Sequence, residues 1–125
     1  MRHIPRVAVI DDDDGVRNSL TSLIRSLGYE ARGYGSAPDF LAAIAHDAPD
    51  CLITDIQMPA MTGDQLQAEL LAAGYRLPMI FMTAFPTAAT RQRVLAAGAC
   101  AFLDKPVEPD AIAEQIATAL AQGRP

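Results

Sequence analysis

The sequence predicts an α/β fold in which helices cover both faces of a doubly wound, five-stranded parallel sheet. Short apolar runs, typical of buried strands, alternate with segments whose apolar residues recur every three or four positions, as on one face of a helix. This strand–helix unit occurs five times along the chain. Strands that alternate with helices in this way form right-handed crossovers and a parallel sheet that is covered on both faces.

The first two units begin with strands of different character. Residues 5–10 form an apolar, β-branched run that predicts a buried strand, and the amphipathic helix after it ends at Gly28, a residue favoured just past a helix C-terminus. Residues 29–35 are less apolar, so this strand is expected at an edge of the sheet. Ser36 then caps the second helix, because its side-chain oxygen can accept a hydrogen bond from the first turn.

The last three units follow the same order. Their strands are expected at residues 51–54, 78–82 and 99–103. The third helix is closed by Gly74, and the fourth, from about residue 87 to residue 97, stops at Gly98. The fifth helix carries an apolar stripe of Ile112, Ile116 and Leu120.

Length and composition favour a single domain and exclude several classes of protein. The chain has 125 residues, half of them hydrophobic, and a net charge of -5, which argues against a sequence-independent nucleic-acid surface or an anionic-membrane surface. No apolar run approaches the roughly 18 residues that span a bilayer, and residues 1–5 lack an export signal. We therefore expect a cytoplasmic domain over residues 1–125, with a core at about 5–121 and a tail or the start of a linker at 122–125.

Polar residues follow four of the five predicted strands, and parallel α/β sheets bind ligands outside the carboxyl ends of their strands. These residues are Asp11 to Asp14, Asp55, Thr83 and Lys105. Carboxylates suit a hard cation such as Mg²⁺, and Lys105, the only lysine in the chain, suits a phosphate oxygen. Together with the Thr83 hydroxyl, these groups favour phosphoryl transfer, with Asp55 as the natural acceptor.

Four motifs at these strand ends resemble the receiver (REC) domain of two-component response regulators. They are Ile-Asp-Asp, Thr-Asp-Ile-Gln-Met-Pro-Ala-Met-Thr-Gly, Met-Thr-Ala and Asp-Lys-Pro, in that order. The resemblance covers essentially the whole chain and looks strongest to the FixJ-type subgroup, through the second motif and Ala-Phe-Leu-Asp-Lys-Pro. It implies the flavodoxin-like (βα)5 receiver fold, with strand order 2-1-3-4-5.

The resemblance also implies a phosphorylation site and a metal site. Asp55 would accept a phosphoryl group from a histidine kinase. Asp12 and Asp55 would bind Mg²⁺ through their side chains, and Gln57 would bind it through its backbone carbonyl. Asp11 would act mainly through a metal-bound water. The protein would thus be a signalling switch rather than an enzyme, although it catalyses its own phosphotransfer and autodephosphorylation.

The switching residues follow from the same resemblance. Thr83 would hydrogen-bond the phosphoryl group, Lys105 would pair with it, and the Lys105–Pro106 peptide bond would be cis. Phe102 stands at the aromatic switch position and would rotate inward as Thr83 moves. The surface of the fourth helix, fifth strand and fifth helix would then favour a partner protein or a second copy of the chain, in a population shift between two packings. No direct contact with nucleic acid or membrane is expected.

The run of aspartates leaves alternatives open. Asp13 and Asp14 either cap the first helix and favour its positive end, or contact the metal. Residues 12–15 also fit the Asp-x-Asp-Gly opening of haloacid-dehalogenase-type phosphatases, which require a further acidic pair after the lysine. A calcium-binding loop fits worse, because Ile10 and Thr21 stand where it needs Asp and Glu. A non-phosphorylated interaction module is the remaining alternative.

Overall fold

A computed structural model describes residues 3–122 of the chain, and within this range five strands form one sheet. The strands are β1 (Arg6–Ile10), β2 (Glu30–Tyr34), β3 (Cys51–Asp55), β4 (Met79–Thr83) and β5 (Ala101–Asp104). All neighbouring strands are parallel, and their order in the sheet is β2-β1-β3-β4-β5. The predicted parallel sheet, its strand order and the edge position of the second strand are confirmed.

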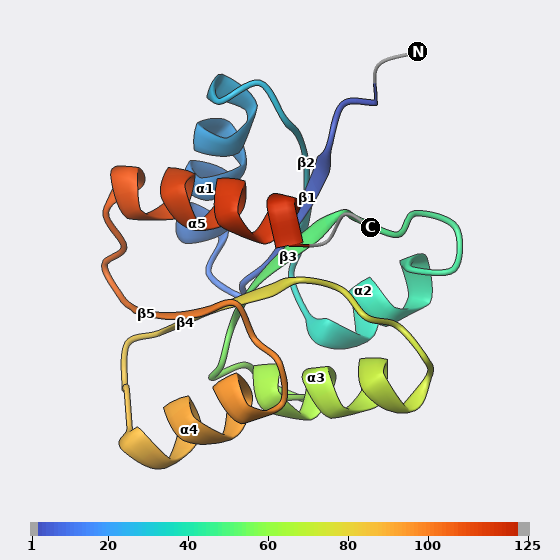
Figure 1. Cartoon of the computed structure of the whole chain (residues 1–125), viewed down its shortest axis with the longest axis vertical. Coiled ribbons are helices and arrows are strands. Elements are labelled where there is room, and N and C mark those ends of the chain that lie inside the picture. Colours follow the sequence, from blue (N-terminus) through green and yellow to red (C-terminus); the bar gives the residue numbers. More distant parts are fainter. Residues whose placement is uncertain (1–2, 123–125) are drawn as a thin grey trace.

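Helices alternate with the strands and cover both faces of the sheet. Within residues 3–122 they are α1 (Asp14–Ser26), α2 (Ala37–Ala43), α3 (Gly63–Ala72), α4 (Ala88–Ala96) and α5 (Pro109–Gln122). Helices α1 and α5 lie on one face, and α2, α3 and α4 lie on the other (Figure 1). Because successive side chains of a strand point to opposite faces, Val7 and Val9 pack under α1 and α5, whereas Ala8 and Ile10 pack on the other side. The doubly wound fold is therefore confirmed.

Helix ends follow the local signals in the sequence. The side chain of Ser36 accepts a hydrogen bond from the Asp39 backbone N–H, as its predicted capping role requires. The glycines that close α1, α3 and α4 adopt left-handed backbone angles that residues with a Cβ rarely take. Their φ angles are 95° at Gly28, 87° at Gly74 and 109° at Gly98.

Strand β5 begins two residues later than predicted. The Ala99 backbone N–H donates to the Val94 carbonyl at 3.0 Å, so Ala99 is held by the turn that closes α4 and not by the sheet. At the C-terminus, α5 extends to Gln122, one residue past the predicted core. The tail was predicted at residues 122–125; Gln122 is the last residue of α5, and residues 123–125 lie outside the described residues. Each helix within residues 3–122 is too short or too polar to cross a bilayer.

Candidate functional site

The carboxyl ends of the strands bring the predicted site residues together. Asp55 is the last residue of β3, Thr83 is the last residue of β4, and Asp11 directly follows β1. Lys105 directly follows β5, and its backbone N–H donates to the Thr83 carbonyl at 2.8 Å, which joins the ends of β4 and β5. Four strands thus supply the site, as the parallel topology predicts.

Lys105 binds two carboxylates at once. Its Nζ lies 2.8 Å from Asp11 Oδ2 and 3.1 Å from Asp55 Oδ2. The side chains of Asp11, Asp55 and Lys105 are 0%, 8% and 18% exposed, so the three charges are largely removed from water. Charges at such depth persist only when they are paired and hydrogen-bonded. The lysine is therefore the internal counter-charge of this site.

Burial and charge act in opposite directions on these groups. Burial raises the pKa of the Asp55 carboxyl, whereas the hydrogen bond and charge of Lys105 lower it. The nearby Asp11 raises it again, so the net pKa of Asp55 lies above its ordinary value. Burial lowers the pKa of the Lys105 ammonium, but the hydrogen bonds and charges of Asp11 and Asp55 outweigh burial and hold this pKa above its ordinary value. The ammonium therefore stays charged between the two carboxylates.

The acidic residues at this edge fit a hard cation. Asp11, Asp12 and Asp55 each present a carboxylate oxygen within 4.8 Å of the other two. Asp55 Oδ1 is buried and has no hydrogen-bonding partner among the described residues. Leaving a buried acceptor unsatisfied costs about 1–3 kcal/mol, a cost that a bound cation would offset. Oxygen ligands of this kind are those that Mg²⁺ and Ca²⁺ prefer.

The other two aspartates of the run belong to helix α1. Asp13 is the N-cap residue, and its Oδ1 accepts from the Val16 backbone N–H at 3.0 Å. Asp14 lies in the first turn, where negative charge is favoured, and pairs with Arg17. The predicted capping role is therefore confirmed for Asp13, and neither residue belongs to the three-carboxylate cluster.

Two residues that shape this site were not predicted from the sequence. Arg17 Nη1 donates to the backbone carbonyl of Asp11 at 2.7 Å and so holds the β1–α1 turn. Gly63 allows α3 to begin directly against β3, because a Cβ there would lie 2.4 Å from the Asp55 carbonyl oxygen. Arg17 and Gly63 are visible in the sequence, but the residue that each contacts becomes known only in the folded chain.

The Thr83 hydroxyl is already engaged in a hydrogen bond. Thr83 Oγ1 donates to the side-chain oxygen Oε1 of Gln57 and accepts from the Phe85 backbone N–H at 3.0 Å. The resemblance implies a role for the Gln57 backbone carbonyl toward the metal, but this contact between the Gln57 side chain and Thr83 was not predicted. Side-chain contacts of this kind depend on rotamers, for which the sequence pattern holds no signal.

Phe102 occupies a half-buried position on β5. It packs against the apolar cluster under α2, α3 and α4, and it lines a pocket together with Thr87 and Arg91 at the beginning of α4. The Lys105–Pro106 peptide bond is cis, as the resemblance implies. Phe102 is thus placed between the core and α4.

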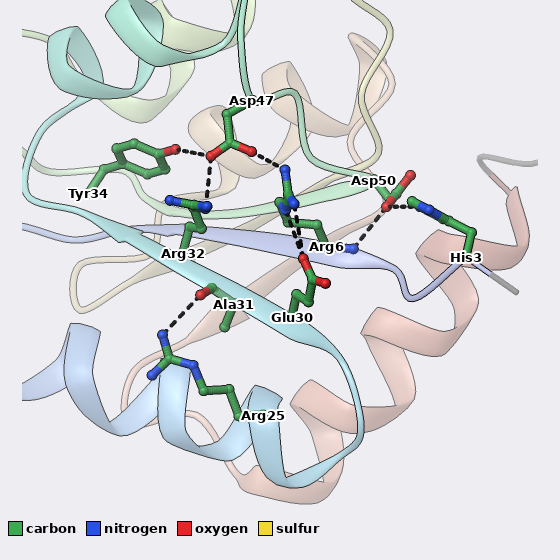
Figure 2. A network of polar contacts seen from close by, with 9 residues as sticks. All are labelled: His3, Arg6, Arg25, Glu30, Ala31, Arg32, Tyr34, Asp47 and Asp50. Atoms are coloured by element: carbon green, nitrogen blue, oxygen red, sulfur yellow. Dashed lines mark hydrogen bonds and ion pairs between the residues drawn. The ribbon is translucent and has the colours of Figure 1, made fainter.

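A second cluster of charged residues surrounds β1 and β2 (Figure 2). Arg6 pairs with Asp47 and, at 3.0 Å, with Glu30. Arg32 also binds Asp47, at 2.9 Å. His3 Nε2 and the Arg6 backbone N–H both bind Asp50 Oδ2, at 2.9 and 2.8 Å. We call this group the β1–β2 network.

The chain belongs to the receiver-domain family of response regulators, because residues 7–117 match the family model described as "Response regulator receiver domain". The transcriptional regulatory protein TdiR of Thauera aromatica is 36% identical over 118 residues, which are 94% of this chain and 52% of TdiR. The transcriptional regulatory protein FixJ of Azorhizobium caulinodans is 37% identical over 114 residues, which are 91% of this chain and 54% of FixJ. The chain thus spans about half the length of these curated relatives.

Solved structures show the same fold. The response regulator StyR matches with a TM-score of 0.87 and 37% identity, over 97% of this chain and 61% of that one. The structure titled FixJ-N matches with a TM-score of 0.86 and 30% identity, over 97% and 96% of the two chains. These similarities confirm the predicted receiver domain with FixJ-like relatives, rather than the phosphatase alternative.

Proposed function

We propose that this chain is a phospho-accepting switch of a cytoplasmic two-component system, in which a histidine kinase phosphorylates Asp55. The observation that supports this proposal best is the state of the Asp55 carboxylate. One of its oxygens pairs with Lys105, while the other is buried and has no hydrogen-bonding partner within residues 3–122. Such a carboxylate is held in place, is close to a cation and keeps an oxygen available for new bonds.

The chemistry is a transfer of one phosphoryl group. A carboxylate oxygen of Asp55 attacks the phosphorus of the phosphohistidine. A P–O bond forms as the P–N bond breaks, and the electron pair leaves with the imidazole nitrogen, which takes a proton from solvent. Lys105 stabilises the negative phosphoryl oxygens, and Thr83 donates a hydrogen bond to one of them. Autodephosphorylation is the attack of water on the same phosphorus, which breaks the P–O bond to Asp55, releases inorganic phosphate and restores the carboxylate.

The acidic cluster would hold the metal ion for this reaction. Asp12 and Asp55 would bind Mg²⁺ through carboxylate oxygens, Gln57 would bind it through its backbone carbonyl, and Asp11 would bind a coordinated water. Bound Mg²⁺ supplies positive charge that neutralises the phosphoryl oxygens. The three clustered carboxylates support this assignment, as does Asp55 Oδ1, which has no hydrogen-bonding partner in the described range.

Phosphorylation would change the packing around α4. The phosphoryl group adds about -1.5 to -2 charges. Thr83 would move toward it, and Phe102 would turn into the space that Thr83 leaves. Helix α4 buries a single residue, Val94, among those described, so apolar packing holds it weakly. This supports α4, together with β5 and α5, as the surface that changes and then binds a partner protein or a second copy of the chain.

We propose that the signal leaves this domain through a further part of a longer protein that contains it. TdiR and FixJ are transcriptional regulators by name, and this chain spans about half of each. We therefore propose a transcriptional output. Direct contact of this chain with DNA is not part of the proposal, because its net charge of -5 disfavours an approach to phosphates.

A phosphotransfer assay tests the proposal. The purified chain is incubated with Mg²⁺ and an autophosphorylated histidine kinase that bears a radioactive phosphoryl group. We expect the label to move to the wild-type chain but not to Asp55→Asn, which keeps the shape of the side chain and loses the nucleophile. Light scattering of the labelled chain then measures dimerisation. Equal labelling of the two proteins would contradict the proposal.

A further inference from the structure

The side chain of Gln57 already accepts the hydrogen bond of the Thr83 hydroxyl, which the proposed switch needs for the phosphoryl group. Thr83 Oγ1 donates its hydrogen to Gln57 Oε1, and the same oxygen accepts from the Phe85 backbone N–H. A threonine hydroxyl has one hydrogen to donate. Thr83 therefore cannot donate to Gln57 and to a phosphoryl oxygen at the same time.

The two partners of this contact differ in their freedom to move. Thr83 is buried at the end of β4, whereas Gln57 is exposed, two residues past Asp55. The backbone next to Gln57 is fixed, because the Ile56 N–H donates to the Met82 carbonyl at 3.0 Å and the Ile56 carbonyl accepts from the Gly63 N–H at 2.9 Å. Release of Thr83 therefore requires only a rotation of the exposed Gln57 side chain.

We infer that Gln57 is a positioning residue, whose side-chain amide holds the Thr83 hydroxyl in the resting state and competes with the phosphoryl group for it. This inference rests on the proposed function, in which Thr83 donates to a phosphoryl group on Asp55. The amide thereby sets how strongly a phosphoryl group must bind before the switch moves. The backbone carbonyl of Gln57 keeps its separate role toward the metal.

The test uses beryllofluoride, a phosphoryl analogue that binds a carboxylate without being hydrolysed, so that any change in dephosphorylation rate does not affect the result. Its affinity for the full chain is measured calorimetrically at saturating Mg²⁺. The variant Gln57→Met keeps the length of the side chain and removes the competing oxygen. We expect it to bind beryllofluoride about fivefold more tightly than wild type, the factor that one net hydrogen bond contributes.

A double-mutant cycle separates competition for Thr83 from other effects. In a Thr83→Ala background the Gln57→Met change is expected to leave the beryllofluoride affinity unaltered, because no hydroxyl remains to be released. Mg²⁺ affinity is measured separately without beryllofluoride, because the backbone carbonyl of the same residue is assigned to the metal. Unchanged or weaker beryllofluoride binding by Gln57→Met would overturn the inference. So would an equal gain in the Thr83→Ala background, or a matching change in Mg²⁺ affinity.

A failure of the proposed function gives a different result in the same experiment. Wild type would then bind beryllofluoride no better than Asp55→Asn, whatever residue stands at position 57. If wild type binds and Asp55→Asn does not, the proposed site is supported, and the Gln57 variants test only the competition for Thr83.

Discussion

Two clusters of charged side chains in the described part of the chain differ in how completely their charges are paired. In the β1–β2 network, Asp47 is bound by both Arg6 and Arg32, and Glu30 also pairs with Arg6 (Figure 2). At the strand ends, Lys105 alone pairs with both Asp11 and Asp55 among the described residues. Asp55 Oδ1 has no hydrogen-bonding partner among them. A charge cluster indicates a ligand site when its hydrogen bonding is incomplete.

Burial strengthens this contrast. Arg6 and Arg32 are 32% and 58% exposed, so water screens their ion pairs, which are typically worth about 0–1 kcal/mol each. The carboxylates of Asp11 and Asp55 are almost fully buried, so an unpaired charge there costs much more. We therefore expect substitutions at the strand ends to have large effects on stability and ligand binding, and substitutions in the network to have small ones.

The largest effect on stability is expected for Lys105→Met, which removes the cation between two buried carboxylates. The free energy of unfolding should fall by about 3 kcal/mol, as when one partner of a buried ion pair is lost. Urea denaturation at neutral pH in EDTA measures this change. Adding Asp11→Asn should recover part of the loss. A loss below about 1 kcal/mol, the range of exposed ion pairs, would remove the contrast between the two clusters.

The next effect concerns the metal. Asp12→Asn should weaken Mg²⁺ binding by about tenfold or more, because it removes a carboxylate ligand from the cluster. Asp14→Asn is the matched control, since Asp14 belongs to the same acidic run but lies in the first turn of α1. Its affinity should change by about twofold or less, because exposed charges are screened by salt. The rise of the melting temperature with Mg²⁺ concentration reports both affinities, and equal losses in the two variants would show that net charge alone attracts the metal.

A smaller effect is expected in the β1–β2 network. Asp47→Asn weakens the ion pairs to Arg6 and Arg32 and should lower the free energy of unfolding by about 1 kcal/mol. The difference from wild type should shrink at high salt, and Mg²⁺ affinity should not change. Denaturation at low and high ionic strength measures the first effect. A clear change in Mg²⁺ affinity would mean that the network and the site are coupled.

The smallest effect is expected in the pH dependence of stability. Burial raises the pKa of Asp50. The hydrogen bonds from the Arg6 backbone N–H and His3, together with the charges of these residues, lower this pKa by more, so its net value is below the ordinary 3.8. Asp50 therefore stabilises the fold above the ordinary pKa, and this contribution is lost as the pH falls through the lowered pKa. Asp50→Asn should be slightly less stable than wild type at pH 6, and the two should converge as the pH falls through the lowered pKa of Asp50. A gap that widens on acidification would contradict this assignment.

Much of the fold and site was predictable, because strand ends in a parallel sheet meet at one edge. Asp11, Asp55, Thr83 and Lys105 each follow an apolar run, so the sequence pattern alone places them together. The start of β5 was misplaced, because Ala99 is as apolar as a strand residue but is bound to the end of α4.

The fine structure of the site was not predictable from the sequence. The contact between Gln57 and Thr83, the hydrogen bond from Arg17 to Asp11 and the unsatisfied oxygen of Asp55 all depend on side-chain rotamers. Each contact joins residues of different elements or turns, and residue type and spacing do not identify the partner. These details nevertheless decide which charge cluster remains open to a ligand.

The most direct test of the phosphorylation site is chemical mapping. The chain is incubated with acetyl phosphate and Mg²⁺, reduced with borohydride, which converts an aspartyl phosphate to homoserine, and digested for mass spectrometry. We predict homoserine at position 55, with none at the paired Asp47 and none when Mg²⁺ is chelated. Homoserine at another aspartate, or an unmodified Asp55 in the presence of Mg²⁺, would contradict the assignment of Asp55 as the acceptor.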